Sequence, residues 1–182
     1  MTHIGTHPLE TARLTLRRLT PDDTEAFFAI MNDERVTRYL LFPRLLELSQ
    51  AEDWIVRDMA LYDNEPNFYL WAMECRETGA LVGTISLHVV REDSDVGEVG
   101  YSLGQGHWGR GLAAEALRAV LGFAFHQVGF NRVEGCHSTR NPASGTVMRK
   151  AGMLYEGMAR EKIKNAMGYH DTHMYGMLKR DY

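Results

Sequence analysis

The sequence predicts a single mixed α/β domain whose first half is antiparallel and whose centre contains one crossover. The 182 residues, 45% of them hydrophobic and 24% charged, are typical of one globular domain, which we expect to span residues 1–182. Segments with alternating or continuous apolar residues, typical of strands, are separated by segments with helical spacing. A glycine-rich loop joins a central strand directly to the most apolar helical segment, which indicates the crossover.

The first half of the chain is predicted to contain a strand, two helices and a hairpin. The segment Arg13–Leu19 alternates leucine with polar residues, as a strand does. The run Thr20-Pro21-Asp22-Asp23 combines a capping hydroxyl, a proline and two acids, and so predicts a helix over Pro21–Met31. Ser49 and Glu52 have capping-box spacing, so a second helix should begin near Ser49. The predicted hairpin consists of the strands Phe68–Cys75 and Leu81–Val90 around the turn Glu77-Thr78-Gly79.

The second half is predicted to alternate strands with helices and to close with a strand pair. The strand Val96–Leu103 leads into the helix Arg110–Gln127, whose polar residues form only a narrow stripe. We therefore expect this helix to pack deeply against a sheet. The strand Arg132–His137 is followed by the short helix Pro142–Ala151, which ends at Gly152. The closing strands are Met153–Lys162 and Tyr169–Leu178.

Composition and charge exclude several classes of protein. A net charge of −4 gives no general affinity for nucleic acid. Two cysteines, Cys75 and Cys136, cannot form a disulfide scaffold. The first ten residues contain no apolar leader, and the longest dense apolar stretch, Ala119–Phe125, is too short to span a bilayer, so we expect a cytoplasmic protein without a membrane segment. His170 and His173 should point to opposite faces of a strand, so no metal site is expected.

Two interpretations of the segment Gly100–Leu117 compete. Glycines at the start of a helix let main-chain N–H groups approach an anion such as a phosphate. The run Gly104–Gly109 spells GxGxxG, which would suggest a nicotinamide-dependent Rossmann enzyme. Such an enzyme needs an acidic residue at the tip of the next strand to hold a ribose, but Cys136–Ser138 stand there. The nicotinamide enzyme is therefore the less favoured alternative.

The other interpretation uses residues spread over nearly the whole chain. The segment Trp108–Ala116 reads WGRGLAAEA, Asn131–Glu134 reads NRVE, and Asn141–Met153 contains N-P-A-S followed by K-A-G-M. Together with the opening strand Arg13–Leu19, these segments resemble the GCN5-related N-acetyltransferases (GNAT), in the RimJ/RimL-like branch of ribosomal-protein alanine acetyltransferases. The resemblance implies the GNAT fold, a twisted, mixed and mostly antiparallel sheet flanked by helices.

The resemblance also implies a binding site for acetyl-coenzyme A (acetyl-CoA) between the strands Val96–Leu103 and Asn131–Ser138. Main-chain groups of the first strand should contact the pantetheine and acetyl groups, loop amides should hold the pyrophosphate, and two polar side chains should face the pantetheine and the sulfur. The implied contacts are Tyr101, Ser102 and Leu103 on the strand; Trp108, Gly109, Arg110, Gly111, Leu112 and Ala113 in the loop; and Asn141 and Ser144 on the short helix.

The sequence departs from the family at the position where many relatives carry a tyrosine acid, because Met148 stands there. We therefore assign Ser144 as the hydrogen-bond donor to the departing thiolate, since acyl transfer leaves negative charge on the sulfur. Glu98, beside the implied thioester, is the candidate general base and would act through a water molecule. The alternatives are that Ser144 caps the short helix and that Glu98 is a solvated strand residue.

The sequence thus predicts transfer of an acetyl group from acetyl-CoA to a primary amine, by direct attack in a ternary complex. The amine belongs to a protein N-terminus or to a small molecule, and the net charge of −4 suits a cationic acceptor. No acetyl-cysteine intermediate is expected, because Cys75 and Cys136 lie in apolar strand segments. A catalytically weak coenzyme A-binding sensor is the second alternative, and a homodimer is the assembly to consider.

Overall fold

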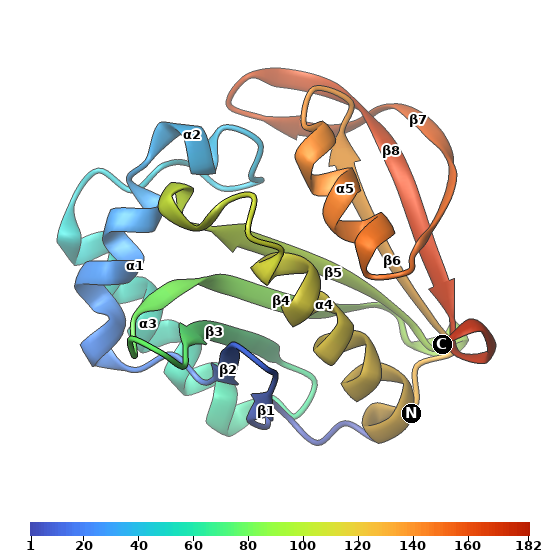
Figure 1. Ribbon diagram of the computed structural model, residues 1–182, viewed down its shortest axis with the longest axis horizontal. Coiled ribbons are helices and arrows are strands. Elements are labelled where there is room, and N and C mark those ends of the chain that lie inside the picture. The colour runs from blue at the N-terminus through green and yellow to red at the C-terminus, as the bar shows by residue number, and fades with distance from the viewer.

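The computed structural model describes residues 1–182 and is built around one eight-stranded sheet (Figure 1). The strand order across the sheet is β1-β2-β3-β4-β5-β6-β8-β7. The strands are β1 (Leu9–Glu10), β2 (Leu14–Arg17), β3 (Tyr69–Cys75), β4 (Leu81–Arg91), β5 (Val96–Leu103), β6 (Arg132–Ser138), β7 (Leu154–Asn165) and β8 (Gly168–Leu178). The α-helices are α1 (Thr24–Met31), α2 (Glu34–Thr37), α3 (Leu48–Asn64), α4 (Leu112–Phe123) and α5 (Pro142–Lys150).

Every pair of neighbouring strands is antiparallel except β5 and β6, which pair in parallel. The predicted hairpin of β3 and β4 and the predicted central crossover, from β5 through α4 to β6, are both confirmed. The central crossover is not the only one, because α5 connects β6 to the parallel strand β7 across β8. The closing strands β7 and β8 form the predicted pair, but β8 lies between β6 and β7. This mixed, mostly antiparallel sheet is not the doubly wound parallel sheet that a nicotinamide-binding Rossmann fold requires.

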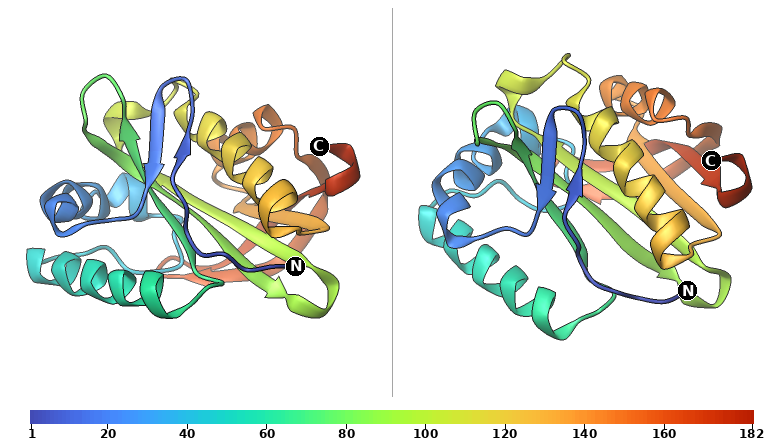
Figure 2. Two further views of the ribbon diagram at one scale, coloured as in Figure 1. Left: turned by 90° about the horizontal axis from the view of Figure 1, so that it is seen from below. Right: turned by 60° about the horizontal axis from the view of Figure 1, so that its bottom comes forward.

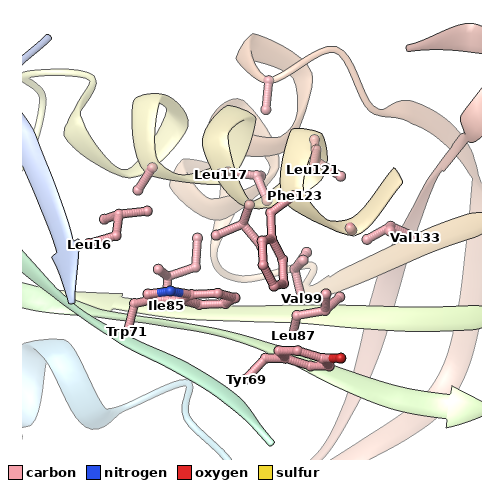
Figure 3. Close-up of a cluster of buried hydrophobic side chains, with 14 of the residues drawn as sticks. Leu16, Tyr69, Trp71, Ile85, Leu87, Val99, Leu117, Leu121, Phe123 and Val133 are labelled. Atoms are coloured by element: carbon pink, nitrogen blue, oxygen red, sulfur yellow. The ribbon is translucent and has the colours of Figure 1, made fainter. Parts of the chain in front are cut away.

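Helices cover both faces of the sheet (Figure 2). A separate hydrophobic cluster lies under the helices of each face. Trp71 of β3 belongs to the cluster under α4, whereas the next residue, Ala72, belongs to the cluster under α1 and α3. The α4 cluster includes Phe123, whose ring meets that of Trp71 edge-on with a centroid distance of 5.3 Å (Figure 3). Truncating a buried aromatic side chain costs about 3–5 kcal/mol, so packing of this kind holds α4 firmly on the sheet.

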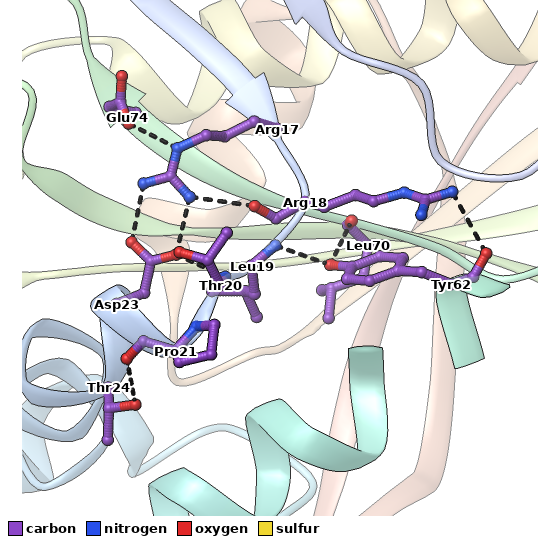
Figure 4. Close-up of polar contacts among 10 residues, drawn as sticks. All are labelled: Arg17, Arg18, Leu19, Thr20, Pro21, Asp23, Thr24, Tyr62, Leu70 and Glu74. Atoms are coloured by element: carbon purple, nitrogen blue, oxygen red, sulfur yellow. Dashed lines mark hydrogen bonds and ion pairs between the residues drawn. The ribbon is translucent and has the colours of Figure 1, made fainter. Parts of the chain in front are cut away.

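The first predicted helix begins with a different kind of turn, because Asp23 bonds backwards along the chain (Figure 4). Its carboxylate accepts hydrogen bonds from the amide of Thr20 at 2.9 Å and from the guanidinium of Arg17 at 2.7 and 2.8 Å. Arg17 also donates to Glu74 on the neighbouring strand. The residues Pro21–Asp23 therefore form a 3₁₀ turn that ties β2 to the helical layer, and α1 starts only at Thr24.

Two other predicted helix ends differ from the structure. The second helix, α3, begins at Leu48, because the side chain of Gln50 accepts hydrogen bonds from the amides of Leu46 and Glu47 at 2.7 and 3.0 Å. The predicted pair of Ser49 and Glu52 therefore lies inside the helix. At the end of α4 the chain continues into a π-helical turn over Ala124–Val128.

The structure adds two short elements to the predicted order, β1 and α2. β1 has only two residues, too few to show a pattern, and it pairs with β2. α2 has four residues and begins where the side chain of Asp33 accepts from the amide of Arg35 at 2.9 Å. Among the helices, none combines the length and the hydrophobicity that a membrane-spanning helix needs.

Candidate active site

The parallel strands β5 and β6 separate halfway along their length. Their pairing covers three registers, from Val96 with Arg132 to Glu98 with Glu134. Beyond Glu98, β5 continues to Leu103 paired only with β4, and β6 continues to Ser138 paired only with β8 (Figure 1). The main-chain groups that face the opening between the two strands therefore have no strand partner, which is unusual in the middle of a sheet.

The ladder between β4 and β5 decides which main-chain groups face this opening. The amide of Gly104 donates to the carbonyl of Val82 at 2.9 Å, and antiparallel hydrogen-bonded pairs alternate along the strands. The backbone of Ser102 therefore faces β4, whereas those of Tyr101 and Leu103 face the opening. The hydroxyl of Ser102 is also engaged, with Thr84 Oγ1 at 3.0 Å. Of the three predicted strand contacts, only Tyr101 and Leu103 turn main-chain groups toward β6.

The glycine loop between β5 and α4 presents a run of free N–H groups. Gly109 and Gly111 have φ values of +75° and +79°, which side chains disfavour, and these conformations delay the helix from the predicted Arg110 to Leu112. None of the six amides from Gly109 to Ala114 donates to a backbone carbonyl. Six consecutive donors at a helix N-terminus form a binding site suited to a phosphate or diphosphate.

Two side chains hold this loop in position. The indole N–H of Trp108, one of the predicted loop contacts, donates to the carbonyl of Leu103 at 2.7 Å and so ties the loop to the end of β5. On the other side, Arg13 of the segment before β2 donates to the carbonyl of Arg110 at 2.9 Å and to the carboxylate of Glu115 at 2.7 Å. The Arg110 side chain itself is exposed and forms no ion pair. Sequence analysis missed Arg13 and Glu115, because no local pattern pairs residues so far apart in the chain.

Ser144 lies on the first turn of α5, across the opening from β5. Its hydroxyl lies 2.9 Å from the hydroxyl of Tyr101, which is also 2.8 Å from the Ser144 carbonyl. The N-cap position of α5 belongs to Asn141, whose side chain makes no capping hydrogen bond. The alternative that Ser144 is a helix cap therefore fails, because its hydroxyl bonds across to the strand instead. One turn further along α5, Met148 is buried to 1% exposure.

Glu98 lies where β5 and β6 begin to separate. Its carboxylate accepts a hydrogen bond from the thiol of Cys136 on β6 at 3.4 Å, and it has no ion pair. Its neighbour in register, Glu134, differs because Arg132 and Arg91 lie 2.8 and 3.5 Å from that carboxylate. Glu98 is thus a carboxylate without a cation, which leaves it available to accept a proton.

The thiol of Cys136 is held in its protonated form. Burial and the nearby Glu98 carboxylate raise the pKa of Cys136 to about 12. A thiol with this pKa is a poor nucleophile at neutral pH, since the thiolate is the reactive form. On the other neighbouring strand, β4, His88 lies in register with Glu98.

The two histidines of β8 do not form a metal site. His170 contacts the hydroxyl of Ser138 at 3.3 Å and the side-chain oxygen of Asn165 at 2.9 Å. His173 instead packs against the ring of His137 with a centroid distance of 5.3 Å. No three His, Cys, Asp or Glu side chains of the chain lie close enough together to hold a metal ion.

Comparison with known proteins identifies the family. A family model of the acetyltransferase (GNAT) domain matches residues 13–154, most of the chain. The chain belongs to the GNAT acetyltransferase family. It is 34% identical to the uncharacterized N-acetyltransferase YoaA of Bacillus subtilis (strain 168), over 94% of this chain and 96% of YoaA. It is 30% identical to YdaF of the same organism, named provisionally as a ribosomal N-acetyltransferase, over 93% of each chain.

A solved GNAT structure agrees with the fold. RimL, a ribosomal L7/L12 α-N-protein acetyltransferase in complex with coenzyme A, has a TM-score of 0.82 and 18% sequence identity to this chain, over 94% of this chain and 98% of RimL. The GNAT family and the GNAT fold that the sequence motifs predict are thus confirmed. The chain is an acetyltransferase, and GNAT enzymes use acetyl-CoA as the acetyl donor.

Proposed function

We propose that this GNAT enzyme transfers the acetyl group of acetyl-CoA to a primary amine by direct attack in a ternary complex. The observation that carries the proposal is the run of free amides from Gly109 to Ala114, which opens beside the gap between β5 and β6. These donors match the charge of the diphosphate of coenzyme A. The gap then runs from the diphosphate site toward Glu98 and Ser144, so one extended molecule could reach from the loop to both side chains.

The remaining contacts divide between the two sides of the gap. On β5, the main-chain groups of Tyr101 and Leu103 would bind the pantetheine as a strand would, except that the Leu103 carbonyl already accepts from Trp108. On α5, the free side-chain amide of Asn141 and the hydroxyl of Ser144 would face the pantetheine and the sulfur. Arg110, exposed in the loop, would add charge near the phosphates.

The chemistry needs one proton acceptor and one hydrogen-bond donor. The amine nitrogen attacks the thioester carbon, a C–N bond forms, the C–S bond breaks, and its electron pair leaves on the sulfur. Glu98 takes the proton that the nitrogen loses, through a water molecule, and returns it to solvent. The Ser144 hydroxyl stabilises the thiolate by hydrogen bonding until the sulfur is protonated from solvent. The products are the amide and free coenzyme A thiol.

Direct transfer fits the state of the cysteines better than an acetyl-enzyme does. Cys136 is the cysteine beside Glu98, and its pKa of about 12 keeps it as a thiol. An acetyl-cysteine intermediate would require its thiolate to attack the thioester first. We therefore propose that both substrates are bound before the chemical step.

The acceptor that we propose is a cationic primary amine, either a protein N-terminus or a small molecule. Glu98 has no internal cation, and the chain carries a net charge of −4, so both local and overall charge favour an approaching ammonium group. An α-amine has a reference pKa of about 7.7–8.0, which makes deprotonation by a carboxylate through water feasible. We further propose that the enzyme acts in the cytoplasm as one catalytic domain, with a homodimer as its assembly.

A panel of amines and N-terminal peptides tests the function, with release of free coenzyme A thiol as the readout. We expect thiol release that depends on the amine and saturates with acetyl-CoA. A coenzyme A-binding sensor, the alternative that Met148 raises, would bind acetyl-CoA without amine-dependent release of thiol. A rise in melting temperature with acetyl-CoA separates these cases from a protein that binds no coenzyme A.

A further inference from the structure

The phenol of Tyr101 connects the two sides of the proposed active site. Tyr101 lies on β5, and its hydroxyl reaches the first turn of α5, 2.8 Å from the carbonyl oxygen and 2.9 Å from the hydroxyl oxygen of Ser144. The side chain therefore connects β5 to α5 at a level where β5 and β6 are no longer paired. The hydroxyl of Ser144 has no other hydrogen-bond partner in the chain, so Tyr101 alone decides how it is oriented.

Counting protons leaves two arrangements in which the two hydroxyls are hydrogen-bonded to each other. A carbonyl only accepts, so in the first arrangement Tyr101 donates to the Ser144 carbonyl, and Ser144 donates its own proton to the phenol oxygen. In the second arrangement Tyr101 donates to the Ser144 hydroxyl oxygen, which leaves the Ser144 proton free for another acceptor. A nearby anion selects the second arrangement, because only this one supplies a proton to it.

We propose that Tyr101 is a positioning residue that directs the Ser144 proton toward the thioester sulfur. This inference rests on the proposed function and deepens it, since it explains how a serine acts where many relatives use a tyrosine on the helix. As negative charge develops on sulfur, the pair shifts to the second arrangement, and the phenol strengthens the serine as a donor by polarising its hydroxyl. The proton of Tyr101 itself stays on the phenol.

The surroundings of the pair support this role. Burial raises the pKa of Tyr101 well above its usual value, so the phenol remains neutral and keeps a proton to donate. The helix position that carries the tyrosine in relatives holds Met148, whose sulfur packs against Gly135 of β6. In this chain the phenol comes from Tyr101 of β5 instead, and its hydroxyl lies beside Ser144, one helical turn before Met148.

The substitution Tyr101→Phe removes the hydroxyl and keeps the ring, so it isolates this contact. We expect kcat to fall about tenfold while KM for acetyl-CoA changes less than about twofold. Tyr175→Phe is the matched control, because Tyr175 is a buried tyrosine of β8 whose hydroxyl accepts from Arg149 of α5 at 2.9 Å and makes no hydrogen bond to Ser144. This control should leave kcat unchanged even if it lowers the melting temperature.

A double-mutant cycle shows whether Tyr101 acts through Ser144. In a Ser144→Ala background the further change Tyr101→Phe should alter kcat by less than about twofold, because the group that it positions is gone. A binding measurement without turnover uses coenzyme A and desulfo-coenzyme A as probes, at a pH above the thiol pKa. The wild type should prefer coenzyme A, and either single variant should reduce that preference about fivefold.

The outcomes separate this proposal from the function on which it rests. If the wild type binds no coenzyme A and releases no thiol with any amine, the proposed function is wrong. If the wild type is active but Tyr101→Phe matches the Tyr175→Phe control in kcat and in probe preference, the positioning role is wrong. Additive losses in the double variant would likewise overturn it, because they would show that Tyr101 acts independently of Ser144.

Discussion

The two ends of the proposed acetyl-CoA site are built in different ways. The phosphate end is a continuous segment, Trp108–Ala114, in which two left-handed glycines and a helix start produce six free amides. The acyl end is assembled from three elements, with Glu98 and Tyr101 on β5, Cys136 on β6 and Ser144 on α5. Anion binding thus depends on local backbone geometry, whereas catalysis depends on how the sheet and α5 are arranged.

This difference predicts where each end is vulnerable. A change in the glycine loop should alter binding of coenzyme A and spare the chemical step. A change at the acyl end should alter kcat and spare binding, because the Tyr101–Ser144 contact and Glu98 both lie where β5 and β6 separate, away from the loop. The following predictions test this division, from the largest expected effect to the smallest.

Gly111→Asp should abolish coenzyme A binding at the phosphate end. The φ of +79° disfavours any side chain, and a carboxylate would stand beside the proposed diphosphate site. We expect the dissociation constant of coenzyme A to rise about a thousandfold, measured by calorimetry. Gly111→Ala adds the strain without the charge, so it should weaken binding far less. Equal binding by both variants would show that the loop does not hold a diphosphate.

Glu98→Gln should remove the general base at the acyl end. We expect kcat to fall about a hundredfold and the acidic limb of the pH–rate profile to disappear, while coenzyme A binding stays unchanged. Glu134→Gln is the matched control, since Glu134 lies in register with Glu98 but is paired with Arg132 and Arg91. An unchanged pH–rate profile in Glu98→Gln would exclude it as the base.

Arg13→Lys should loosen the glycine loop from outside. Lysine cannot reproduce the guanidinium fork that contacts both Glu115 and the Arg110 carbonyl. We expect the dissociation constant of coenzyme A to rise about fivefold, equivalent to about 1 kcal/mol, with kcat preserved. Arg76→Lys serves as control, because Arg76 donates to the Thr11 carbonyl at 2.8 Å on the same edge without touching the loop. A loss of kcat at constant affinity would contradict the division between the two ends.

Asp23→Asn should affect stability and neither end of the site. Burial acts to raise the pKa of Asp23, but hydrogen bonds from Arg17 and Thr20 outweigh it, so the net pKa lies below the ordinary value of 3.8. The stabilisation is therefore present above that ordinary value and is lost as the pH falls through the folded-state pKa. We expect the free energy of unfolding of the variant to be about 2 kcal/mol lower than that of the wild type at neutral pH. It should also change less than the wild-type value as the pH falls.

The control for that experiment is Asp22→Asn. Asp22 is the exposed neighbour of Asp23 and forms no ion pair. Urea unfolding at pH 7 and at pH 3 compares the two variants with the wild type. The same loss of stability in both variants would mean that the bonds of Asp23 to Arg17 and Thr20 contribute nothing of their own.

Local sequence patterns predicted most of the helices and strands. Where these predictions differ from the structure, the cause is local. The hairpin β3–β4, the crossover helix α4 and the short helix α5 with its terminal Gly152 follow from periodicity and glycine positions, and the structure contains all three. The start of α4 was misplaced by two residues, because Gly109 and Gly111 adopt left-handed conformations that a helix cannot include. Two-residue β1 and four-residue α2 are too short to produce a period.

The parts of the candidate site also differ in whether local sequence could predict them. The glycine loop is visible in the sequence because its function lies in consecutive residues. The brace of Arg13 and Glu115, and the bond of Tyr101 to Ser144, join residues 102 and 43 positions apart. No periodicity connects such residues, because side-chain direction and strand register decide which of them meet.

The sequence by itself determined the family, the order of the main elements and the position of the glycine loop, since each shows in short motifs of consecutive residues. Only the tertiary structure decided that β8 inserts between β6 and β7, that β5 and β6 separate after Glu98, and that the phenol beside Ser144 comes from a strand. These features depend on the pairing and packing of distant segments, in which the burial of two cores on opposite faces of one sheet outweighs local preference.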